Sequence, residues 1–128
     1  MPTLFAAMAV AGAVAATTLA QPAAESPIMC NLQALTPAER TAHAATTKKL
    51  AAAVMKVEDV DGGYRIHVNG TLAASELLQW VDAERRCCPF LDFEVRLARE
   101  DGARWLQMTG RPGVKAFMAA EFKLASTR

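Results

Sequence analysis

The chain of 128 residues has a formal net charge of +1 at pH 7, and 21% of its residues are charged. This length is enough for one ordinary domain. A nucleic-acid-binding domain normally carries a basic patch or stripe. Here 14 lysines and arginines are scattered among 13 acidic residues, which argues against a nucleic-acid partner. The pattern identifies no protein partner, and we expect no stable membrane span once the N-terminal segment has been processed.

Residues 1–20 differ in composition from the rest of the chain. "LFAAMAVAGAVAATTLA" contains no charged side chain, and the small residues of "TLAQPA" follow it. This pattern predicts a secretory signal peptide over 1–20, although "MPT" supplies no Lys or Arg. An uncleaved anchor, a buried helix, or translation starting at Met29 are the alternatives. We therefore expect a linker over 21–29, a single domain over 30–125, and a periplasmic or secreted protein. A start at Met29 would make the protein cytoplasmic.

The first predicted helix begins at "TPAER". Thr36 can cap it, Pro37 suits its first turn, and Glu39 completes a capping box. The alanine-rich composition extends the helix to about residue 54, with an apolar stripe that includes Ala42 and Ala45. The strand "MKVEDV", the turn "DGG" and the strand "YRIHV" follow. In the second strand every other residue is apolar, which predicts one buried face.

The second predicted helix is "ASELLQWVDAERRC", in which apolar residues recur at helical spacing. Pro89 ends it and pushes Cys88 toward extended geometry. Two strands, "FEVRLA" and "RWLQMTG", then flank a D-G turn, and "GVKAFMAAEFKLA" is a third helix. The order α-ββ-α-ββ-α contains a possible ββα repeat. It predicts a two-layer α+β domain, with helices on one face of a four-stranded antiparallel sheet.

Three cysteines are the main candidates for chemistry. Cys30 precedes the first helix, and Cys87 and Cys88 are adjacent at the end of the second. Thiolates suit Cu(I), Zn(II) and similar thiophilic ions, Hg(II) among them. Adjacent side chains on a helix diverge by about 100°, so the pair can converge only where the helix unwinds, which Pro89 favours. The sequence therefore predicts a site for a soft metal or metalloid ion, formed by Cys30, Cys87 and Cys88.

Other interpretations of the cysteines stay open. Free cysteine is often simply buried as a small hydrophobe, in which case the protein is a non-catalytic interaction module. A thiol-redox protein would use Cys87 or Cys88 as its nucleophile and Cys30 as the resolving thiol. An oxidising compartment would leave one disulfide and one odd thiol. The sequence favours binding over catalysis and identifies no catalytic residue.

The remaining polar candidates have simpler explanations. Glu84 shares a helix face with Cys87, where it can act as a base or as a hydrogen-bond acceptor. A solvated or arginine-paired carboxylate is the plainer interpretation. His43 and His67 are expected on polar faces, and their spacing forms no metal-binding pair. We interpret "TGRPGVK" as a strand-to-helix turn, since its spacing matches neither phosphate-binding fingerprint.

The motifs "ERRCCPFLDFEVRL" and "LQMTGRPGVKAFMAAEF" resemble a family of small uncharacterised bacterial proteins. Members share the patterns E-R-x-C-C-P-F-x-x-F and L-x-x-T-G-x-x-G-V-K-x-F. "CNLQALTPAER" also resembles the way in which such proteins begin. The resemblance spans residues 30–122, and it implies that Cys30, Cys87 and Cys88 belong together without naming their ligand.

Overall fold

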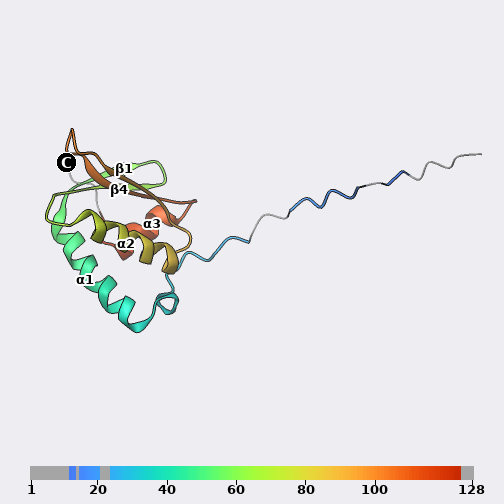
Figure 1. Cartoon of the computed structure of the whole chain (residues 1–128), viewed down its shortest axis with the longest axis horizontal. Helices are drawn as coiled ribbons and strands as arrows, with labels where there is room; N and C mark the ends of the chain where they lie inside the picture. Colours follow the sequence, from blue (N-terminus) through green and yellow to red (C-terminus); the bar gives the residue numbers. More distant parts are fainter. Residues whose placement is uncertain (1–11, 14, 21–23, 125–128) are drawn as a thin grey trace, which may run out of the picture.

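The computed structural model describes residues 12–13, 15–20 and 24–124. Its three α-helices lie on one side of a four-stranded antiparallel sheet (Figure 1), so the predicted α+β fold is confirmed. Residues 1–11 and 14 of the predicted signal peptide lie outside the described residues. The same holds for 21–23 of the predicted linker and for 125 at the end of the predicted domain. Among the described residues, no helix is long and apolar enough to cross a membrane.

The observed elements follow the predicted order α-ββ-α-ββ-α. In chain order they are η1 (Leu32–Ala34), α1 (Pro37–Ala53), β1 (Val54–Val60), β2 (Gly63–Val68), α2 (Ala74–Cys87), β3 (Asp92–Leu97), β4 (Arg104–Thr109) and α3 (Val114–Glu121). The capping box at the start of α1 is confirmed. The Thr36 hydroxyl accepts from the Glu39 N–H at 3.2 Å, and the Glu39 carboxylate accepts from the Thr36 N–H at 2.7 Å. Such a cap stabilises a helix by about 1 kcal/mol.

The sheet has the strand order β1-β2-β4-β3. Its two hairpins meet where Ile66 of β2 pairs with Leu106 of β4. Ile66 also pairs with Val57 of β1, and Leu106 with Val95 of β3. The register is therefore symmetric about the Ile66–Leu106 pair, which is the arrangement that two successive ββα units produce.

The core lies between the sheet and the helices. Alternate residues of β2 and β4 are buried there, and α2 contributes its apolar face. The buried side chains of these three elements are Tyr64, Ile66, Val68, Leu77, Trp80, Val81, Glu84, Cys87, Leu106 and Met108. The predicted apolar stripe of α1 was wrong in its first half. Ala42 and Ala45 are exposed, and α1 buries only Leu50 and Ala53, because its first half borders an open groove instead of the core.

Candidate functional site

The end of α2 places two adjacent cysteines in different backbone conformations. Cys87 is the last helical residue. The Cys88 N–H still donates to the Glu84 carbonyl at 2.7 Å, but Cys88 itself has φ −122° and ψ 72°. A residue before proline is expected to leave the helical region in this way. The predicted unwinding at Pro89 is confirmed, and it lets both side chains turn into the interior.

The segment before α1 is docked against the end of α2. The Asn31 N–H donates to the Cys87 carbonyl at 2.7 Å, and Ile28 packs against the core. Arg111 donates to the Ser26 carbonyl and pairs with Glu25 at 3.4 Å. This part of the predicted linker therefore follows the domain surface, and it brings Cys30 to the other two cysteines.

Cys30 and Cys88 form a disulfide, with a distance of 4.5 Å between their Cα atoms. Cys87 is the free thiol, and its Sγ lies 3.7 Å from Cys88 Sγ. Cys87 and Cys88 are buried, whereas Cys30 is half-buried. The three predicted residues are thus brought together, but in an oxidised form that holds one thiol and one disulfide. A site of three thiolates requires that the disulfide first be reduced by two electrons.

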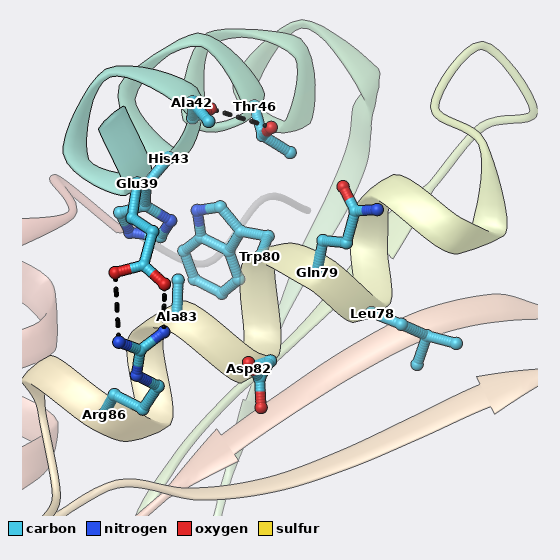
Figure 2. A pocket seen from close by; sticks show the side chains of 10 residues that line it. All are labelled: Glu39, Ala42, His43, Thr46, Leu78, Gln79, Trp80, Asp82, Ala83 and Arg86. Atoms are coloured by element: carbon cyan, nitrogen blue, oxygen red, sulfur yellow. Dashed lines mark hydrogen bonds and ion pairs between the residues drawn. The ribbon is translucent and has the colours of Figure 1, made fainter. Parts of the chain in front are cut away.

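Glu84 is buried beside the cysteines, with 5% of its surface exposed. The simpler expectation of a solvated or arginine-paired carboxylate was wrong. Its position three residues before Cys87 puts it on the buried face of α2. Its Oε2 atom accepts from Cys87 Sγ at 3.3 Å and contacts Cys88 Sγ at 3.6 Å. Arg86 pairs with Glu39 of α1 instead, at 2.8 Å (Figure 2).

His43 of α1 completes this cluster. From the sequence we expected it on the polar, solvent-facing side of its helix, and that expectation was wrong. Only 10% of its side chain is exposed, and its Nε2 lies 3.5 Å from Glu84 Oε2. Its ring stacks on Trp80, with centroids 5.7 Å apart (Figure 2). The Nδ1 atom is buried without a hydrogen-bond partner. No sequence signal places His43 here, because its surroundings depend on how α1 packs against α2.

A groove of about 460 Å³ between α1 and α2 borders the cluster at His43. His43, Trp80 and Ala83 are among its lining residues, and the Glu39–Arg86 pair lies at one end (Figure 2). His43 therefore stands between solvent in the groove and the buried carboxylate and thiol.

The environment raises the pKa of the Cys87 thiol to about 12. Burial is the main cause, followed by the charge of Glu84 and the hydrogen bond to it, while the charge of Arg86 has a small opposing effect. The sequence alone does not decide the direction of this pKa shift, because the C-terminal end of a helix raises a thiol pKa and nearby arginines lower it. Cys87 is therefore protonated at neutral pH, which makes it a poor nucleophile. As a metal ligand it would have to release its proton.

The other polar candidates lie elsewhere. His67 is on the outer face of β2, half-buried beside Glu58. The "TGRPGVK" stretch is a strand-to-helix turn, in which Gly113 caps α3 with φ 97°; that prediction is confirmed.

Comparison with known proteins provides no identification, since no family model, no curated protein and no solved structure matches the chain. The site must therefore be interpreted from its own chemistry.

Proposed function

We propose that the protein binds a thiophilic ion, such as Cu(I) or Hg(II), through Cys30, Cys87 and Cys88 when the disulfide is reduced. The supporting observation is the convergence of the three sulfurs. Cys87 Sγ lies 3.7 Å from Cys88 Sγ, which is bonded to Cys30. With metal–sulfur bonds of about 2.3 Å, neighbouring sulfurs lie about 3.8 Å apart in a tetrahedral site and about 4.0 Å apart in a trigonal three-sulfur site. The spacing of the pair already suits a shared ion.

The surroundings also favour a cation over free thiolates. Cys87 and Cys88 are buried, and the Glu84 carboxylate adjoins both. Thiolates in such a place would repel the carboxylate and lose their hydration, so without an ion the thiols keep their protons. A bound cation supplies the missing positive charge and displaces those protons, which couples binding to pH.

The two competing interpretations explain less of the site. The thiol-redox interpretation allows Cys87 or Cys88 as the nucleophile. A redox nucleophile works best when its pKa is near the ambient pH, whereas the pKa of Cys87 is raised to about 12. The Cys30–Cys88 disulfide fits a redox pair that uses Cys88. That pair gives no role to Cys87, which lies against the buried Glu84 carboxylate. Cysteines that merely fill a core would account for their own burial. They would not account for a buried carboxylate placed against both of them.

The test is a titration of anaerobically reduced protein with Cu(I) against a competing chelator, followed by thiolate charge-transfer absorption. We expect one ion per chain. Cys30→Ser removes a direct ligand and should weaken binding by more than about 100-fold. Loss of a residue that only hydrogen-bonds to a metal ligand already weakens binding by roughly 10–100-fold. The oxidised wild type is the matched control and should lack the three-thiolate spectrum. Wild-type binding no tighter than that of the Cys87→Ser, Cys88→Ser double variant would refute the proposal.

A further inference from the structure

We infer that His43, Glu84 and Cys87 form a second metal-ion site, for a borderline divalent ion such as Zn(II), while Cys30 and Cys88 remain disulfide-bonded. The site would use one imidazole, one carboxylate and one thiolate. It shares only Cys87 with the three-sulfur site proposed above. The second site requires no reduction of the disulfide. It therefore goes beyond the three-sulfur proposal and does not depend on that proposal.

The first argument is that Glu84 has no permanently charged partner, since its only ion-pair contact among the described residues is the titratable His43. Among the described residues Glu84 is the one buried charged side chain, and no lysine or arginine in the described ranges pairs with it. Arg86, two residues further on, is held by Glu39. A buried carboxylate is costly unless it is paired or coordinates a metal. A cation beside Glu84 Oε2 would provide that partner.

The second argument is the spacing of the donor atoms. Glu84 Oε2 lies 3.5 Å from His43 Nε2 and 3.3 Å from Cys87 Sγ. In tetrahedral zinc sites with bonds of about 2.0–2.3 Å, neighbouring donors lie about 3.3–3.6 Å apart. Both distances are close to that range, and the three donor groups lie within 4.8 Å of one another.

The third argument is that His43 faces Glu84 through Nε2 and leaves its other ring nitrogen unsatisfied. The ring is nine-tenths buried and its Nδ1 has no hydrogen-bond partner. Stacking on Trp80 holds the ring in place. His43 also lines the groove between α1 and α2, so the histidine side of the proposed site borders solvent. Three protein ligands and one solvent position are typical of exchangeable or catalytic zinc sites, not of closed structural ones.

The donor set decides the kind of ion. Magnesium and calcium take oxygen ligands, whereas mixed imidazole, carboxylate and thiolate donors suit zinc. The disulfide then selects between two sites that share Cys87. The oxidised protein offers one sulfur to a borderline ion, and the reduced protein offers three sulfurs to a soft one.

The experiment uses Co(II) as a spectroscopic probe of oxidised, full-length protein, with Zn(II) as the competitor. We expect one Co(II) per chain, a thiolate-to-cobalt charge-transfer band, four-coordinate d–d bands, and displacement by Zn(II). Cys87→Ser should abolish the charge-transfer band. His43→Asn and Glu84→Gln should each weaken binding by more than about tenfold, or 1.4 kcal/mol. The controls are His67→Asn, at the other histidine, and Glu121→Gln on α3, and both should bind as wild type does.

Absence of a saturating cobalt spectrum below about 1 mM would overturn the inference, because three protein ligands should give a binding free energy larger than the roughly 4 kcal/mol to which 1 mM corresponds. So would a spectrum that survives both Cys87→Ser and His43→Asn. Circular dichroism and thermal melts check that each variant folds. Cys87→Ser changes one atom, so it decides the question even if Glu84→Gln unfolds. His43→Asn in reduced protein should retain Cu(I) binding, which separates failure of this site from failure of the three-sulfur site.

Discussion

The Cys30–Cys88 disulfide should contribute a measurable part of the stability of the domain. It joins residues 58 positions apart in the chain. By the chain-entropy relation, closing a loop of that length in the unfolded state stabilises the native state by about 4 kcal/mol at 25 °C. Observed disulfides typically give about 2–4 kcal/mol. We therefore expect reduction of this bond to lower the free energy of unfolding by about 2–4 kcal/mol.

The best perturbation is Cys30→Ser, since Cys30 is half-buried whereas Cys88 is 0% exposed. The substitution removes the bond with little change in packing. Urea unfolding should give the same stability for Cys30→Ser as for reduced wild type. Adding reductant should not change the stability of the variant further.

Cys87→Ser is the matched control, because it leaves the disulfide intact and must respond to reductant as wild type does. If it does not respond, the bond involves Cys87 instead of Cys88. Thiol counting should find one free thiol in unreduced, denatured protein. Three free thiols there, or a wild-type free energy of unfolding that reductant leaves unchanged, would refute the reasoning.

Three further predictions concern pH and close packing. Because the pKa of Cys87 rises from 9.0 to about 12 on folding, stability that is intact below pH 9 should be lost as the pH rises toward 12. Cys87→Ala should remove that slope, which is at most about 1.4 kcal/mol per pH unit in urea unfolding; an unchanged slope would contradict the assignment. Hydrogen bonds from Arg86 and the helix cap lower the pKa of Glu39 from 4.5 to about 2. Its contribution should be intact above pH 4.5 and lost as the pH falls toward 2, and Glu39→Gln should flatten this part of the profile of melting temperature against pH. At Gly63 an added Cβ would lie 1.9 Å from a β4 carbonyl oxygen, so Gly63→Ala should lower stability by about 1–3 kcal/mol or more. Gly70→Ala, which meets only the end of an arginine 3.5 Å away, should change stability by less than about 1 kcal/mol; equal melting temperatures for the two variants would contradict the packing argument.

The fold could be predicted because its signals are local. Thr36 and Glu39 mark the start of α1, and Pro89 marks the end of α2. The D-G turns and the alternation of apolar residues in β2 define the hairpins. Each of these signals acts within a few residues, and tertiary contacts strengthen them without overriding them.

The site could be predicted only in part, because it depends on packing between distant segments. Grouping Cys30 with the cysteine pair was possible from the sequence, but the choice of Cys88 as the bonded partner was not. That choice follows from the path of residues 25–31 across the domain, which Arg111 and the Asn31 hydrogen bond determine. His43 was missed for a similar reason, since α1 is rich in alanine and its amphipathic pattern is too weak to show which side meets α2.

The position of the disulfide also has a mechanical consequence. The bond links Cys30, ahead of α1, directly to Cys88, just before β3. Residues 31–87 therefore form a covalently closed loop that contains α1, β1, β2 and α2. A pulling force applied through the chain before Cys30 would pass through the two sulfurs to the chain that leads into β3. In the oxidised protein the elements of this loop would be shielded from the load, whereas in the reduced protein η1 and then α1 would be the first elements that the force reaches.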